Sequence, residues 1–177
     1  MTGAIPAWVD GRLRPVDKLQ VHLDGLRHMA VSVFVLCGDA LLLQRRALAK
    51  YHTPGLWANT CCTHPHWGEG VADCASRRLR EELGLTGIGL APMGRVEYRA
   101  DVGGGMFEHE VVDVFAGHVA RRPVLAPDPD EVMETRWIAL RELDRQVRQR
   151  PEAYTPWLRI YLADGVIRAA AEAVEPG

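Results

Sequence analysis

Thiols, an imidazole and paired charges are concentrated in residues 59–84 of the chain. Cys61, Cys62 and His64 come first, and a helix-like run of arginines and glutamates follows at 77–84. A thiol can transfer a proton, an imidazole can bind a metal, and guanidinium groups can hold an anion. Packing alone does not account for so many reactive groups in one short stretch. We therefore interpret this segment as part of an active site.

A second set of residues could bind a diphosphate. Arg45, Arg46 and Lys50 precede the reactive segment, and Arg78 lies on its helix-like part. A lone surface arginine is usually only a solvated charge, but three or four cations around one segment favour an anion site. Glu82 could hold a bridging Mg²⁺ that keeps several waters. Alternatively, Glu82 and Arg78 form an i, i+4 surface pair worth a few tenths of a kcal/mol.

Glu108 and Glu110 form a second candidate site in a strand-like stretch. Residues two apart in a strand project from the same face, so both carboxylates would meet one site. Two neighbouring like charges need a cation or a shared proton, which suits metal binding or acid chemistry. The alternative is a solvent-facing edge strand. His22, His28 and His64 are the other candidate ligands, although a single histidine is more often structural.

Composition limits the class of protein. With 177 residues, of which 47% are hydrophobic, residues 1–177 are expected to form a single domain. The formal net charge of -2, from 21 basic and 23 acidic side chains, predicts no bulk attraction to nucleic acid or acidic membranes. No apolar run approaches a membrane span and no signal core is visible, so we expect a cytoplasmic protein. The four cysteines include an adjacent pair, which favours reduced thiols over a disulfide framework.

Periodicity predicts a sheet flanked by helices, in the α/β (α+β) class. Segments 29–36 and 41–44 flank a turn-like stretch at 37–40, which suggests a hairpin with a buried strand. Apolar residues recur every four positions from Val71, and Gly84 suits the helix end. The other expected elements are extended segments at 96–99 and 108–116, a strand at 135–138, and helices at 139–149 and 156–171. This mixed order is typical of a sheet covered by helices.

The order and spacing of these motifs resemble those of type I isopentenyl-diphosphate isomerases, a family of the Nudix superfamily. The resemblance extends from about residue 18 to residue 157, and its pieces are 45–50, 54–57, 59–65, 98–100, 108–111, 130–133 and 156–157. The Nudix box is degenerate, and the residues that fit it are Glu69, Arg77, Glu81, Glu82 and Gly84. Thr63 stands at the first glycine of the box, and Arg78 stands where a glutamate follows the arginine.

The resemblance implies a Nudix-like mixed sheet flanked by helices and a 1,3-allylic rearrangement of isopentenyl diphosphate to dimethylallyl diphosphate, by protonation and deprotonation, in isoprenoid biosynthesis. It implies that Cys62 and Glu110 are the two residues that transfer protons, each as an acid or a base, and that Tyr98 assists the glutamate. The implied ligands of one divalent metal, Mn²⁺, Zn²⁺ or Mg²⁺, are His22, His28, His64, Glu108 and Glu110. Glu82 would hold the Mg²⁺ that accompanies the diphosphate. The implied phosphate contacts are Lys18, Arg46, Lys50 and Arg78. His22 and His28 stand one residue closer together than the family pattern implies.

An alkene is a poor base, so this chemistry needs a strong acid in a site closed to water. Trp157 could stabilise the carbocation with its ring by about 1 to 2 kcal/mol. Its alternative role is that of an ordinary core tryptophan. Cys62 would act as a thiolate, with a pKa lowered by nearby cations, whereas Cys61 would pack as a small apolar side chain.

Two other functions fit parts of the sequence. A Nudix hydrolase of a nucleoside or other diphosphate would share the fold and the Mg²⁺, but it would require a glutamate at the position of Arg78. A non-catalytic diphosphate-binding module would have no reason to combine Cys62, Tyr98 and Glu110. A prenyl diphosphate is therefore the expected small-molecule partner.

Overall fold

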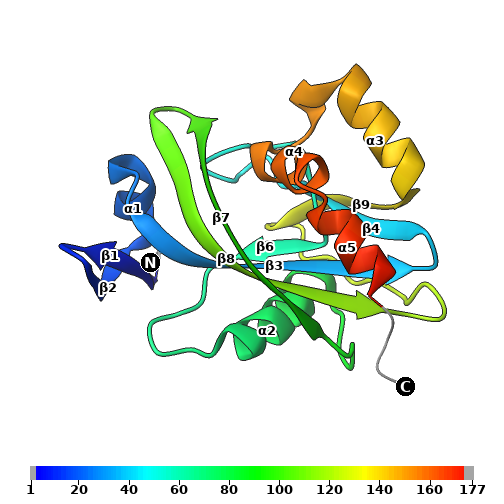
Figure 1. Ribbon diagram of the computed structural model, residues 1–177, viewed down its shortest axis with the longest axis horizontal. Helices are drawn as coiled ribbons and strands as arrows, with labels where there is room; N and C mark the ends of the chain where they lie inside the picture. Colours follow the sequence, from blue (N-terminus) through cyan, green and yellow to red (C-terminus); the bar gives the residue numbers. More distant parts are fainter. Residues whose placement is uncertain (1–2, 174–177) are drawn as a thin grey trace.

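A computed structural model describes residues 3–173 as one mixed, nine-stranded sheet with helices on both faces (Figure 1). The strands are β1 Ala4–Val9, β2 Arg12–Asp17, β3 Arg27–Cys37, β4 Ala40–Arg46, β5 Trp57–Ala58, β6 Cys61–Thr63, β7 Ala91–Gly103, β8 Met106–His118 and β9 Val132–Ala139. The helices are α1 Lys18–Asp24, α2 Val71–Leu83, α3 Leu140–Gln149, α4 Pro156–Ala163 and α5 Val166–Glu172, with a short 3₁₀ turn η1 at Pro151–Ala153. None of the helices in this part of the chain is long and apolar enough to cross a membrane.

Strand β3 is the centre of the sheet. It runs parallel to β8 and pairs antiparallel with β4, β6 and, at one position, β1. In Figure 1 helix α2 lies on one side of this strand, and helices α4 and α5 lie on the other. The expected α/β (α+β) class is confirmed.

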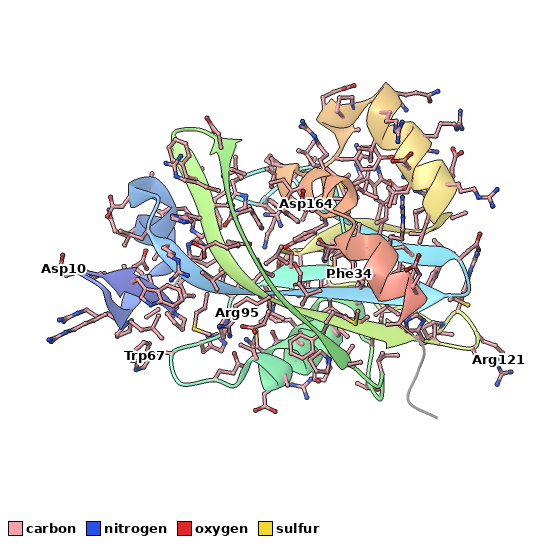
Figure 2. All side chains as sticks on the ribbon, viewed as in Figure 1. Asp10, Phe34, Trp67, Arg95, Arg121 and Asp164 are labelled. Carbon is pink, nitrogen blue, oxygen red and sulfur yellow. The ribbon has the colours of Figure 1, made fainter. Side chains whose placement is uncertain are left out.

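Alternate side chains of β3 enter two separate cores, as the period of a strand requires. Val31, Val33 and Val35 pack with the apolar side of α2. Phe34 packs on the opposite face with residues of α4 and α5 and is labelled between the sheet and these helices in Figure 2. A strand buried on both faces explains why segment 29–36 is an almost continuous apolar run.

The structure lengthens several expected strands and divides one expected helix. The extended segments predicted at 96–99 and 108–116 are parts of the 13-residue strands β7 and β8, which form one antiparallel hairpin. The prediction of one helix over 156–171 is wrong, because Asp164 and Gly165 interrupt it between α4 and α5. Gly165 has a φ of 75°, which a continuing helix does not allow. The hairpin of β1 and β2, helix α1 and the short strands β5 and β6 were not predicted.

Helix α2 ends where the sequence predicts, at a left-handed Gly84 whose N–H donates to the carbonyl of Arg80. A Cβ on Gly84 would approach the Cβ of Ala126 to 2.7 Å, and φ is 68°. We expect Gly84→Ala to lower the free energy of unfolding by about 2–5 kcal/mol, from backbone strain plus overpacking. Gly38→Ala is the matched control, because its φ is 58° but nothing lies within 4 Å of the added Cβ. Strain alone predicts a loss of about 1–2 kcal/mol there. Equal losses in urea titrations of the two variants would contradict the packing argument.

Candidate active site

Ten of the thirteen expected site residues line one inner pocket, to which the sheet, α1, α2, α4 and the loop that joins β4 to β5 contribute. Its volume is about 30 Å³, and it is lined by Lys18, Arg46, Lys50, Cys62, His64, Arg78, Glu82, Glu108, Glu110 and Trp157. His22, His28 and Tyr98 are not among its lining residues. An outer pocket of about 350 Å³ shares Lys18, Lys50, His64 and Arg78 with it.

Three histidines and Glu108 form a cluster, of which His64 and Glu108 also line this pocket. One ligand atom from each of His22, His28, His64 and Glu108 lies within 4.8 Å of every other, and all four residues are buried. The Nε2 of His22 is 3.1 Å and that of His28 is 3.4 Å from Glu108 Oε2. The Nε2 of His64 is 2.9 Å from Glu110 Oε1. Strand pairing explains part of this convergence, because His28 on β3 stands opposite Glu110 on β8.

Helix α1 brings His22 into the cluster despite its altered spacing to His28. Asp17 caps the start of α1 by accepting hydrogen bonds from the N–H groups of Leu19 and Gln20. Gly25, with a φ of 60°, ends the helix and turns the chain into β3. The helix and the tight turn therefore place both rings against one carboxylate.

The tautomers of two histidines favour a cation in the cluster. His22 Nδ1 donates to the Lys18 carbonyl at 2.6 Å, and His28 Nδ1 donates to the Leu26 carbonyl at 2.7 Å. In a neutral ring the Nε2 lone pair then faces a carboxylate oxygen, which only a proton or a metal ion between them makes favourable. The buried Nδ1 of His64 has no partner among the described residues. This set of imidazole and carboxylate donors fits a divalent cation.

The electrostatics of the cluster also favour a positive charge here. Burial opposes protonation of His28, but hydrogen bonds with Glu108 and Glu110 outweigh it and raise the pKa of His28 to about 10. Burial, together with the charge of Glu108, raises the pKa of Glu110 to about 7. For Glu108, the hydrogen bonds from three histidines overcome burial and hold its pKa well below the usual range.

Cys62 and Glu110 both line the inner pocket, and each has a hydroxyl partner. The Tyr98 hydroxyl donates to Glu110 Oε2 at 2.5 Å. The Ser32 hydroxyl donates to Cys62 Sγ at 3.2 Å and is 2.8 Å from the Tyr161 hydroxyl. The hydroxyls of Ser32 and Tyr161 therefore form a short chain of hydrogen bonds that ends at the sulfur.

The prediction that cations lower the pKa of Cys62 is wrong. Burial raises the pKa of the thiol well above its usual value, and the charge of Glu110 adds to this. Arg46 and the hydrogen bond from Ser32 act in the opposite direction but are outweighed. The sulfur is therefore a neutral thiol at neutral pH. Cys61 is fully buried beside α2, as predicted, and all four cysteines are free.

Two cations of the pocket, Arg78 and Lys50, are paired with carboxylates. Arg78 is 2.6 Å from Glu82 and 3.2 Å from Glu131, and Lys50 forms an ion pair with Glu131. Glu82 is only 4% exposed and also accepts a hydrogen bond from Gln44 at 2.8 Å. The alternative of a solvent-exposed Arg78–Glu82 pair is therefore wrong.

Glu108 and Glu110 are not on a solvent-facing edge. Strand β8 lies between β3 and β7, and the two glutamates are 2% and 1% exposed. Trp157 is a core residue, 2% exposed, and it also lines the inner pocket. Arg46 lies over its ring, 5.3 Å from the centroid.

Sequence reasoning missed Ser32 and Tyr161, the hydroxyl groups near Cys62, and also His52 and Glu131. His52 is buried with Nε2 3.0 Å from Glu108 Oε1, and Glu131 joins Lys50 to Arg78. Glu131 falls in a motif that carried the resemblance, at 130–133, but no charge partner was visible. His52 is a lone histidine in a turn-rich loop, and its spacing to other ligands gives no signal.

The chain is similar in sequence to known proteins over most of its length. The NUDIX domain family matches residues 26–158. The isopentenyl-diphosphate Delta-isomerase of Cereibacter sphaeroides strain KD131 is 63% identical over 168 residues, covering 95% of each chain. The protein of the same name from Dinoroseobacter shibae is 63% identical over 164 residues, covering 93% of each chain.

Solved structures show the same fold at low sequence identity. DR0079 from Deinococcus radiodurans has a TM-score of 0.71 and 14% identity, covering 94% of this chain and 98% of that chain. A MutT NUDIX hydrolase from Burkholderia pseudomallei has a TM-score of 0.61 and 23% identity, covering 77% and 96%. At these identities the likeness shows the fold alone.

Proposed function

Since the chain belongs to the NUDIX-domain family of isopentenyl-diphosphate Delta-isomerases, we propose that it converts isopentenyl diphosphate to dimethylallyl diphosphate in isoprenoid biosynthesis. The observation that carries the proposal is that Cys62 and Glu110 line one inner pocket, which shares Lys18, Lys50 and Arg78 with a larger outer pocket. The reaction needs two proton-transfer groups around a hydrocarbon and an anion site beside them. This pocket offers both.

The diphosphate is assigned to the cationic outer pocket. Lys18, Lys50 and Arg78 line both pockets and can donate to phosphate oxygens there. Arg46 lines the inner pocket and extends the cationic surface inward. The carboxylate of Glu131 now holds Lys50 and Arg78, so binding of the diphosphate exchanges one anionic partner for another.

Glu110 is assigned as the acid that protonates the terminal alkene carbon. Its pKa, raised by burial to about 7, leaves a proton available near neutral pH, and the hydrogen bond from Tyr98 fixes the carboxyl group. The new C–H bond uses the alkene electron pair and leaves a tertiary carbocation, or a transition state that resembles one. Trp157 lines the same pocket and its ring would stabilise this charge, while the burial of Glu110, which is 1% exposed, limits the access of bulk water.

Cys62 is assigned as the base that removes a proton from the neighbouring methylene. Loss of that proton forms the new double bond and returns the electron pair. Because the resting sulfur is a thiol, its own proton would first pass to the ionised carboxylate of Glu110, which forms the thiolate base and the protonated acid together. The donors Ser32 and Tyr161 are placed to stabilise the resulting thiolate. The pair also supports the reverse reaction, since the acid of one direction is the base of the other.

Two divalent metal ions belong to the proposal. Glu82 would hold Mg²⁺ beside the diphosphate, where the ion would neutralise phosphate charge. His22, His28, His64, Glu108 and Glu110 would hold Mn²⁺, Zn²⁺ or Mg²⁺, since imidazoles combined with carboxylates accept all three. A metal at this second site would orient Glu110, whose Oε1 is 2.9 Å from His64 Nε2.

The rival hydrolase lacks support at one position. Arg78 replaces a glutamate of the Nudix box, and its guanidinium is 2.6 Å from Glu82. The site thereby loses one candidate metal carboxylate.

We also propose that residues 1–177 form a single domain and that the enzyme acts in the cytoplasm, where thiols stay reduced, as the four free cysteines favour.

Metal removal tests the function. Enzyme dialysed against a chelator should lose isomerase turnover by at least about 100-fold and regain it with Mg²⁺ plus Mn²⁺. Phosphorus NMR of isopentenyl diphosphate incubated with the metal-loaded enzyme should show an intact diphosphate throughout, while proton NMR shows the dimethylallyl product. Release of inorganic phosphate without that product would replace isomerisation by hydrolysis.

Lys50→Ala tests the diphosphate site. Loss of one charge-assisted contact should raise KM about 10- to 100-fold and leave kcat within about threefold, because the lysine touches no reacting atom. Arg95→Ala is the control, since Arg95 is exposed and pairs with Asp113 across the β7–β8 hairpin. An unchanged KM in steady-state assays of Lys50→Ala would exclude the contact.

A further inference from the structure

His52 contacts the oxygen of Glu108 that the other histidines leave free. Its Nε2 is 3.0 Å from Glu108 Oε1. The second oxygen, Oε2, is the one that His22 and His28 approach, at 3.1 and 3.4 Å. His52 is 5% exposed, so water does not compete freely for this contact. The carboxylate is thus held from two opposite sides by imidazoles.

Proton counting gives His52 a different tautomer from His22 and His28. A carboxylate oxygen only accepts hydrogen bonds, so the contact with Glu108 requires the proton of His52 on Nε2. The neutral ring then accepts at Nδ1, where the Thr53 hydroxyl lies at 3.1 Å and can donate. With a cation bound in the cluster, His22 and His28 would carry their protons on Nδ1, which faces a backbone carbonyl, and would turn the Nε2 lone pair to the cation. His52 is therefore a hydrogen-bond donor to the carboxylate, not a lone-pair donor.

The loop around His52 is built to fix this ring. Thr53 has a φ of 47°, a left-handed conformation that a β-branched residue rarely adopts. Arg46 donates to the carbonyl of His52 at 3.2 Å. The imidazole meets the Tyr51 ring edge to face at 4.5 Å and the Trp157 ring at 6.0 Å between centroids. Strain of this kind persists only where surrounding contacts hold it, and here it aims His52 at Glu108.

We propose that His52 is a positioning residue for the metal, which donates to Glu108 Oε1 and so presents Oε2 to the cation held by His22, His28 and His64. The proposal rests on the metal site of the proposed function. A carboxylate hydrogen-bonded through one oxygen binds the metal through the other, and loss of such a partner weakens metal binding about 10- to 100-fold. His52 also packs on Trp157, so it links the metal site to the wall of the substrate pocket.

Metal affinity measured without substrate tests this role. Metal-free protein is titrated with Mn²⁺ alone, and the free ion is followed by electron paramagnetic resonance. His52→Leu should bind Mn²⁺ about 10- to 100-fold more weakly than the unmodified protein. His52→Gln should stay within about threefold, because its side-chain amide N–H can replace the Nε2–H donor. The control is His109→Gln. His109 follows Glu108 on β8 and lies on the opposite face of that strand, where its ring contacts exposed Glu97.

A second readout separates positioning from direct ligation. The visible absorption of bound Co²⁺ reports the number and type of its ligands, and it should be the same in His52→Gln as in the unmodified protein. A changed Co²⁺ spectrum in His52→Gln would make His52 a ligand and overturn the proposal. Unchanged Mn²⁺ affinity in His52→Leu would overturn it too, while leaving the metal site intact. If the unmodified protein bound neither ion, the metal site itself would fail, and this inference with it. Should His52→Leu not fold, His52→Asn, whose shorter amide cannot reach Glu108, takes its place with the same expected loss.

Discussion

Glu110→Gln is expected to fold normally and to lose isomerase turnover by about 10⁴-fold. Glutamine preserves the shape of the side chain and the hydrogen bond from Tyr98 but has no proton to give to an alkene. Tyr98 cannot replace it, because burial raises the pKa of its hydroxyl well above the usual value. The measurement is kcat with isopentenyl diphosphate, together with a thermal unfolding curve and the Mn²⁺ content of the purified variant.

Glu97→Gln is the matched control for this experiment. Glu97 lies on the neighbouring strand β7 but is exposed and pairs with Arg27 at 2.7 Å. Removing its charge should leave kcat unchanged, since exposed ion pairs contribute little and Glu97 is not a pocket residue. A Glu110→Gln enzyme with more than about one tenth of the normal kcat would remove Glu110 from the proton transfer.

Cys62→Ala is expected to reduce kcat by about 10³- to 10⁴-fold, with substrate binding retained. The methyl group cannot accept a proton, whereas Lys18, Lys50 and Arg78 still hold the diphosphate. The pocket should stay closed, because the lost sulfur is small and its neighbours Ser32 and Tyr161 remain hydrogen-bonded to each other. Binding is measured by calorimetry with the unreacted substrate, and turnover by single-turnover kinetics.

Cys37→Ala controls for the general effect of removing a thiol. Cys37 is a partly exposed residue at the end of β3, far along the strand from Ser32 and the site. Its loss should not change kcat. If Cys62→Ala turned over as fast as Cys37→Ala, a different base would have to be sought.

The parts of the site that depend on local periodicity were predictable from the sequence. The two-residue spacing of Glu108 and Glu110 predicted a shared face, and both side chains are buried on one side of β8. The four-residue period from Val71 and the final glycine predicted α2 within one residue at its end. Such features need only the geometry of one strand or one helix.

Other parts depend on contacts between distant segments and could not be read from spacing. The parallel pairing of β3 with β8 sets His28 opposite Glu110, 82 residues apart by their numbers. Helix α1 brings His22 to Glu108 across a separation of 86 residues. The family resemblance named these histidines, but only the tertiary structure shows why the shortened spacing is tolerated.

Burial explains one remaining difference, and a strained turn explains the other. The pKa of Cys62 was expected to fall because cations are near in sequence, but desolvation of the enclosed sulfur outweighs them. His52 was overlooked because a single loop histidine gives no pattern, and its role arises from a strained turn that faces Glu108. Neither enclosure nor a left-handed threonine is visible in residue order.

The most direct test of the central claim is the fate of solvent hydrogen. Isopentenyl diphosphate is incubated with the metal-loaded enzyme in deuterated water, and the product is analysed by proton and deuterium NMR. A proton delivered by Glu110 and another removed by Cys62 predict dimethylallyl diphosphate with deuterium in the new methyl group and both phosphates in place. A product without deuterium, or release of phosphate with no product, would contradict the account.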